Sequence, residues 1–160
     1  MSQLIPDQPC YAVAFLQNMW VRDPNRVKAM ITKDGEELRS RLIEYSLFAG
    51  CVTGRRIKKA FGQEALDKIV WEESTREIAG DPKTIFPPDP AHIADVLKKH
   101  DPTVVITFGQ IAYKAVKPLW TGALLQLPHP AARQPDTINR LNAGGKLFRS
   151  MFNIPEWRAS

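Results

Sequence analysis

A histidine held between two prolines is the first candidate for a catalytic or ligand-binding group. His129 follows the apolar run 124–127 and stands between Pro128 and Pro130. Proline fixes φ and removes a backbone donor, so the loop is stiff where the run ends. A rigid support holds an imidazole in one position, as catalysis or ligand binding requires. A surface loop with an incidental histidine is the alternative interpretation of the same residues.

The elements that must position this histidine follow from the hydrophobic pattern. Short apolar runs alternate with segments of helical periodicity, which predicts an α/β fold: a three-layer α/β/α sandwich with a central, mainly parallel four-stranded sheet. Strands are expected at residues 11–16, 68–71, 103–108 and 123–127, and helices at 36–47, 53–61, 91–100, 110–116 and 137–152. Loops are expected at 23–25 and 72–90, with a turn at 33–35. Gly144 and Gly145 are expected to weaken the last helix.

Polar side chains follow two of these strands. Gln17 and Asn18 come after the first strand, and His129 comes after the last. In open parallel sheets, ligands bind beyond the carboxyl ends of the strands. The architecture therefore predicts that Asn18 and His129 meet across one cleft.

Length and composition narrow the class of protein. The chain has 160 residues, of which 44% are hydrophobic, and one domain over residues 1–160 is expected. No apolar run approaches the roughly 20 residues of a membrane span, and residues 1–9 lack the features of a signal peptide. A cytoplasmic protein without a membrane partner is therefore expected. Two cysteines, Cys10 and Cys51, and three histidines predict neither a disulfide scaffold nor a structural metal site. The formal net charge of +5 favours polyanionic partners, including nucleic acid.

Four segments, in this order, resemble the uracil-DNA glycosylase superfamily. Residues 16–20 are similar to its first loop, and residues 48–55 to its base-stacking aromatic segment. Residues 104–112 are similar to its strand–Gly–helix step, and residues 129–133 to its HPS-type second motif. The resemblance spans about residues 10–152. The first motif is degenerate, because Leu16, Met19 and Trp20 stand in place of the usual glycines and proline. In the second motif, Ala131 replaces the common serine.

This resemblance implies a DNA glycosylase that hydrolyses the N-glycosidic bond of a damaged or modified base, with uracil among the candidates. It implies a monomer that uses no metal and no cofactor and acts on single- or double-stranded DNA. Asn18 would hold the attacking water through its amide, and His129 would donate an N–H to the base oxygen as negative charge grows there. A turn residue that bonds its own backbone is the alternative role for Asn18.

The base-binding residues implied by the resemblance are Gln17, Phe48 and Glu72. Phe48 would be the stacking platform, and a core phenylalanine at a helix end is its alternative role. Glu72 begins the segment Glu-Glu-Ser, where the superfamily often has a base-reading asparagine. An ionised carboxylate accepts hydrogen bonds and cannot donate them. The chain is therefore expected to prefer an exocyclic amine or a ring N–H over a carbonyl of uracil.

Three basic residues, Arg55, Arg56 and Arg133, are candidates for phosphate contacts, which position DNA without reading its sequence. A solvated helix face is the alternative for the basic run that begins at Arg55. Two other functions fit the same fold. One is a non-catalytic nucleic-acid- or nucleotide-binding protein, which the degenerate first motif favours. The other is a hydrolase of free nucleosides or nucleotides.

Overall fold

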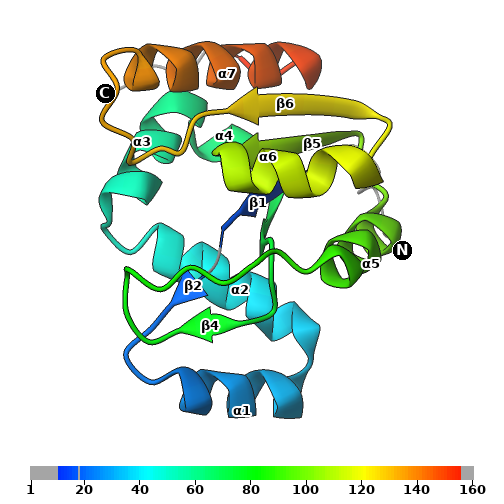
Figure 1. Cartoon of the computed structure of the whole chain (residues 1–160). Helices are drawn as coiled ribbons and strands as arrows, with labels where there is room; N and C mark the ends of the chain where they lie inside the picture. The colour runs from blue at the N-terminus through cyan, green and yellow to red at the C-terminus, as the bar shows by residue number, and fades with distance from the viewer. Residues whose placement is uncertain (1–10, 18, 156–160) are drawn as a thin grey trace.

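A parallel sheet of four strands lies at the centre of the computed structural model, which describes residues 11–17 and 19–155 (Figure 1). The strands are β1 (Ala12–Leu16), β3 (Ile69–Glu73), β5 (Val104–Phe108) and β6 (Ala123–Leu127). Their order across the sheet is β3-β1-β5-β6, and each neighbouring pair is parallel. All four carboxyl ends therefore lie along one edge of the sheet, and the predicted α/β class is confirmed.

Helices cover both faces of this sheet, which gives the three layers of Figure 1. Buried side chains of α2 (Glu36–Leu47), α3 (Val52–Phe61), α4 (Gln63–Leu66) and α7 (Thr137–Met151) belong to one core cluster. Those of α5 (Pro90–His100) and α6 (Gln110–Val116) belong to the other. Further elements are α1 (Pro24–Asp34), the short helix η2 (Lys117–Leu119) and the strand pair β2 (Met19–Trp20) and β4 (Ile78–Ala79).

Burial on both faces explains why β1 and β5 read as nearly continuous apolar runs. Along β1, Ala12, Ala14 and Leu16 pack in one core cluster, whereas Val13 and Phe15 pack in the other. Successive side chains of a strand point to opposite faces, and a parallel sheet covered by helices needs apolar residues on both. The pattern therefore predicts the strand but not the face that each side chain takes.

Strand β3 is longer than the sequence predicts. It runs on to Glu73, because residues 72 and 73 continue the parallel pairing with β1. The expected loop 72–90 also contains β4, which pairs in parallel with β2. Strands of two residues have no periodicity that a sequence pattern can reveal.

Helix α1 occupies residues 24–34, where the sequence predicts only a loop and a turn. The side chain of Asp23 caps this helix by accepting a hydrogen bond from the backbone N–H of Arg26 at 3.2 Å. Pro24 is the first helical residue, where its fixed φ suits the helix and its missing N–H costs nothing. The Asp-Pro pair therefore starts a helix instead of forming an isolated turn.

The glycines of α7 serve close packing and do not merely weaken the helix. Gly144 and Gly145 are buried, and a Cβ on Gly145 would lie 2.0 Å from the carbonyl oxygen of Ala60 in α3. Nearby on α7, Nη1 of the buried Arg149 donates to the carbonyls of Ala60 and Phe61 at 2.8 and 3.0 Å. Helix α7 therefore satisfies carbonyls at the end of α3 while its backbone lies against them.

Candidate active site

A cavity of about 370 Å³ opens at the carboxyl edge of the sheet. Three of the polar side chains on its wall come from strand ends: Gln17 after β1, Glu73 at the end of β3, and His129 after β6. The apolar part of the wall includes Leu16, Trp20, Ile43, Leu47 and Ile85. Small-molecule sites span roughly 300–1,000 Å³. The cavity therefore suits a ligand of nucleobase or nucleoside size better than a large cofactor.

Ser74 ties together the strand ends that supply two of these polar groups. Its backbone N–H donates to the carbonyl of Leu16 at 2.9 Å and to that of Gln17 at 3.1 Å. Its hydroxyl also donates to the carbonyl of Leu16, and Leu16 lies opposite Glu73 in the strand register. These bonds fix the backbone at Gln17 and Glu73, so both side chains start from rigid positions.

The loop that carries His129 is held from two sides. At the end of β5, the backbone N–H of Gly109 donates to the last carbonyl of β6 at 2.9 Å. A Cβ on Gly109 would lie 3.4 Å from Cβ of His129, and its φ of +95° also favours glycine. From α3, Nη1 of Arg56 donates to the carbonyls of Pro130 and Ala132 at 2.8 and 3.2 Å. The histidine is therefore presented from a braced loop, as its flanking prolines suggest.

A backbone hydrogen bond fixes the protonation pattern of the His129 ring. The N–H of Ala131 donates to Nδ1 of His129 at 3.1 Å, so Nδ1 accepts and the ring proton is on Nε2. Burial lowers the pKa of His129 below its usual value of 6.5. Near pH 7 the ring is therefore neutral and offers one N–H donor. A preorganised donor of this kind stabilises negative charge that develops on a bound group.

Glu73 is a buried acid on the same cavity wall. The residue is 6% exposed, and its Oε2 has no hydrogen-bond partner within the described part of the chain. Burial raises the pKa of Glu73 to about 8, the charge of Glu72 adds to the increase, and Arg39 opposes it. At pH 7 Glu73 is therefore mainly a neutral carboxylic acid, which donates as well as accepts hydrogen bonds.

A stiff turn at Asp81 forms another part of the wall. The Asp81 carboxylate accepts from the backbone N–H groups of Lys83 and Thr84 at 2.8 and 2.9 Å, and from the Thr84 hydroxyl at 2.8 Å. The bond from the Thr84 hydroxyl, followed by that from Lys83, lowers the pKa of Asp81. An ionised carboxylate on a fixed turn therefore faces the cavity.

The structure brings Gln17 and His129 to one cavity, whereas the sequence predicts that Asn18 and His129 meet there. Asn18, the predicted partner of His129, lies outside the described residues. Thus the cleft exists where the topology rule places it, and the amide that it contains among the described residues is that of Gln17.

The structure places Phe48 away from this cavity. Its ring packs edge-on against Trp71, with ring centroids 5.3 Å apart, and it lines a separate hollow. Trp20, 48% exposed, is an aromatic side chain on the cavity wall itself. The aromatic ring that lines the cavity is therefore that of Trp20 and not that of Phe48.

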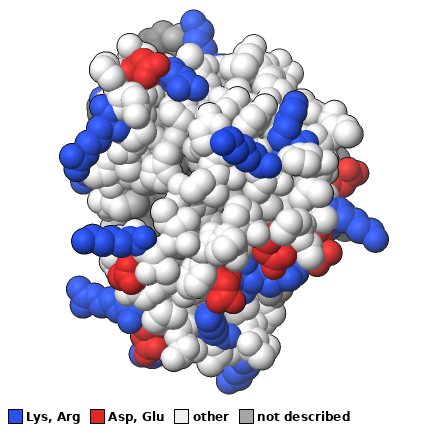
Figure 2. Space-filling view, in the orientation of Figure 1, with Lys and Arg blue, Asp and Glu red and all other residues white. Residues whose placement is uncertain are grey.

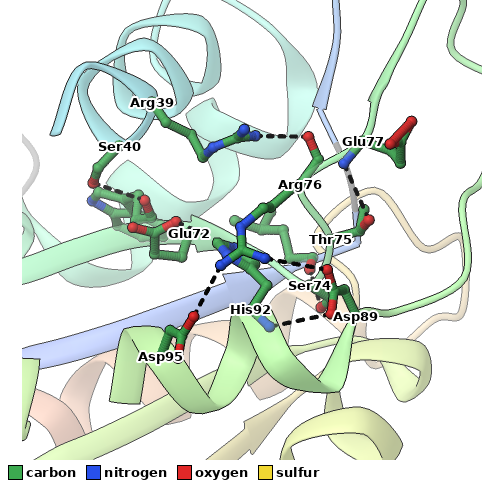
Figure 3. Close-up of polar contacts among 12 residues, drawn as sticks. Arg39, Ser40, Glu72, Ser74, Thr75, Arg76, Glu77, Asp89, His92 and Asp95 are labelled. Atoms are coloured by element: carbon green, nitrogen blue, oxygen red, sulfur yellow. Dashed lines mark hydrogen bonds and ion pairs between the residues drawn. The ribbon is translucent and has the colours of Figure 1, made fainter. Parts of the chain in front are cut away.

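Glu72 also lies elsewhere, on the opposite face of the sheet. Adjacent residues of a strand face opposite sides, so Glu72 faces α5 when Glu73 faces the cavity. Its Oε1 lies 3.8 Å from Nε2 of the buried His92. Figure 3 shows this region, where Arg76 pairs with two aspartates. The carboxyl group that lines the cavity is therefore that of Glu73 and not that of Glu72. Only the pairing of β3 with β1 shows which of the two faces the cavity.

The predicted phosphate-binding arginines have different surroundings. Arg55 and Arg133 are exposed, whereas Arg56 is half-buried and bonded to the His129 loop. On the face drawn in Figure 2, Lys and Arg occur in both halves, while Asp and Glu lie mainly in the lower half. Arg56 therefore positions the histidine, and Arg55 and Arg133 are accessible to a polyanion.

Three further findings bear on the class of protein. Within residues 11–17 and 19–155, no three His, Cys, Asp or Glu side chains gather as metal ligands would. None of the helices that the structure describes has both the length and the apolar character needed to cross a bilayer. The chain matches no protein-family model and no curated protein.

Proposed function

We propose that the protein is a DNA glycosylase that hydrolyses the N-glycosidic bond of a damaged or modified base, uracil being one candidate. The proposal rests on one observation: the neutral His129, with its ring proton on Nε2, lines a cavity of about 370 Å³ at the carboxyl ends of the strands. The resemblance of residues 129–133 and three earlier segments to the uracil-DNA glycosylase superfamily supports it. The work expected of the site is to stabilise a departing base.

The chemistry needs a hydrogen-bond donor more than a strong base. When the bond between the base and C1′ breaks, its electron pair goes to the base and positive charge stays on the sugar. His129 donates to the base oxygen, where such a donor contributes roughly 3–4 kcal/mol. The ionised Asp81 favours the positive sugar by its charge. Water then adds to C1′, and its proton passes to the released base or to solvent.

The base must first leave the DNA stack, which costs a few kcal/mol. An aromatic platform offsets part of this cost, since base stacking contributes roughly 1–3 kcal/mol. Trp20 takes this role in place of Phe48, because Trp20 lines the cavity and Phe48 packs against Trp71. Outside the cavity, the exposed Arg55 and Arg133 contact phosphates and set the position of the strand.

Base release from DNA tests the proposal. Single- and double-stranded oligonucleotides that carry uracil, hypoxanthine or another modified base are incubated with the protein and then treated with alkali. Alkali cleaves a strand at a site that has lost its base, so strand cleavage supports a glycosylase. Binding without cleavage across the panel would support a non-catalytic nucleic-acid-binding protein, which the degenerate first motif favours. Release from free nucleosides alone would indicate a hydrolase of small substrates.

Replacing Arg56 with methionine is expected to slow base release about tenfold or more at saturating DNA. Methionine keeps much of the apolar packing but removes two hydrogen bonds to the His129 loop, and a displacement of about 1 Å costs up to about 10²-fold in rate. Arg55→Met, on the same helix, removes the same charge without touching the loop. It is expected to weaken DNA binding in a salt-dependent manner while the rate at saturation stays close to wild type. Equal losses of rate in both variants would contradict the positioning role of Arg56.

A further inference from the structure

We propose that Glu73 binds the base as a neutral carboxylic acid, through one donated and one accepted hydrogen bond. This rests on the proposed function and specifies the class of base: a neutral ring with an acceptor beside a donor, as uracil has at O4 and N3. Glu73 ends its strand opposite Leu16 and lines the cavity together with Gln17 and His129. It therefore stands where the base edge would be read, while His129 serves another oxygen of the same ring.

The unsatisfied oxygen of Glu73 points to a ligand. Buried polar side-chain atoms in proteins nearly always have a hydrogen-bond partner. Oε2 of Glu73 has none among the described residues, although the residue is 6% exposed and lines the cavity. A ligand that bonds this oxygen removes the cost of leaving it unpaired. The cavity is therefore built for a polar edge as well as for an apolar ring.

The surroundings of Glu73 favour its neutral form. Burial raises the pKa of Glu73 to about 8, and the negative charge of Glu72 on the same strand acts in the same direction. Arg39 of α2 acts against them. Other titratable side chains that face the cavity are Asp81, Cys51 and His129. Asp81 is ionised and His129 is neutral near pH 7, so neither supplies a positive charge that would ionise Glu73.

A neutral acid and an ionised carboxylate select different ligands. The ionised form only accepts hydrogen bonds, so it favours a cation or a pair of donors. The neutral form has an O–H donor next to a carbonyl acceptor, which is the pattern of a carboxamide. An acid in this state accepts a ring N–H and donates to the neighbouring carbonyl. The preference against a uracil carbonyl, expected for an ionised carboxylate, therefore does not hold for Glu73 below its pKa of about 8.

Uracil binding as a function of pH tests this inference. Wild type, Glu73→Gln and Glu73→Leu are titrated with uracil, and the methyl NMR signals of Leu47 and Ile85 in the cavity wall report occupancy. The wild-type dissociation constant is expected to rise about tenfold between pH 7 and pH 9, because an acid of pKa 8 falls from about 90% to about 10% protonated. Glutamine keeps a donor and an acceptor at every pH, so its constant should change less than about twofold. Glu73→Leu should bind at least about tenfold more weakly than wild type at pH 7, since it has neither group.

Thermal unfolding checks the charge state of Glu73 without any ligand. The folded-state pKa of about 8 is above the ordinary value of 4.5, so the folded protein holds a proton that the unfolded chain releases. The contribution of Glu73 to wild-type stability is therefore fully present below pH 4.5 and is lost as pH rises toward 8. The unfolding temperatures of wild type and Glu73→Gln should be similar near pH 5, and the variant should be the more stable near pH 9. If the unfolding temperatures of wild type and Glu73→Gln changed with pH in parallel, Glu73 would not be neutral in the folded protein.

Several binding results would overturn the role of Glu73 itself. They are a flat wild-type pH profile, no uracil binding by wild type, unchanged affinity in Glu73→Leu, or a profile of Glu73→Gln that falls like that of wild type. Base release on DNA is scored separately. Binding of uracil with the expected pH profile but without release would leave the reading by Glu73 standing and reject the glycosylase. Base release from DNA together with a flat pH profile of uracil binding would support the glycosylase and reject the reading of the base by Glu73.

Discussion

Base release by a His129→Ala variant is expected to be about 10²–10³-fold slower than by wild type at neutral pH. Loss of a single oxyanion-type donor has an effect of this size in enzymes, and the proposed mechanism gives Nε2 of His129 this role. The bond from the Ala131 N–H to Nδ1 orients it before any substrate arrives. Single-turnover release from a uracil-containing oligonucleotide at saturating protein measures the chemical step apart from product release.

His100→Ala is the matched control for this prediction. His100 is also a half-buried imidazole, and burial lowers its pKa as well. It ends α5, however, and its ring contacts Tyr11 instead of the cavity. Its loss should change the rate of base release by less than about twofold, because substitutions away from a site usually have small effects. Wild-type rates in a folded His129→Ala protein would reject the proposed catalytic role.

Gly145→Ala is expected to destabilise the protein by about 2 kcal/mol or more, although alanine is the better helix former. At an open helical position the same exchange would stabilise by about 1 kcal/mol. Here the new Cβ would lie 2.0 Å from the carbonyl oxygen of Ala60 and 2.6 Å from its carbon. The backbones of α3 and α7 must move apart, which strains the bonds from Arg149 to the end of α3. Overpacking of this kind typically costs about 1–3 kcal/mol and sometimes more. Denaturant unfolding measures the change.

Ala143→Gly separates helix propensity from packing in this experiment. Ala143 is an exposed neighbour on α7, so its replacement should cost only the propensity difference of about 1 kcal/mol. The two exchanges run in opposite chemical directions, yet both should destabilise the protein. A gain of stability in Gly145→Ala would contradict the close contact between the two helices.

The elements that bury a continuous surface could be predicted from the sequence. The expected ranges for β6, α2 and α6 agree with the structure, because apolar runs and helical stripes mark packed elements, although in β6 only Leu127 is buried. The rule that ligands bind at the carboxyl ends of parallel strands predicted a cleft there for Asn18 and His129, and the structure has a cavity at that edge that Gln17 and His129 line. Helix α1 had a readable signal too, since Asp23 followed by Pro24 is a helix start as well as a turn.

The remaining parts of the site depend on contacts that a sequence pattern does not encode. Both faces of β3 are buried, so no polar alternation reveals that Glu73 faces the cavity and Glu72 faces α5. Arg56 reaches a carbonyl 74 positions away in the chain, and only the packing of α3 beside the His129 loop determines that partner. A basic run on a helix looks the same whether one of its arginines braces a loop or contacts DNA.

The position of β1 within the sheet also has a consequence for protein synthesis. This strand is made first but lies between β3 and β5, with residues 12–15 paired to residues 104–107. At roughly 5–20 residues per second, about 5–20 s separate the translation of β1 from that of β5. During this interval an apolar strand keeps an open edge, the kind of surface on which nascent chains aggregate. Ribosome-associated chaperones therefore have both a target and the time to bind it before the sheet closes.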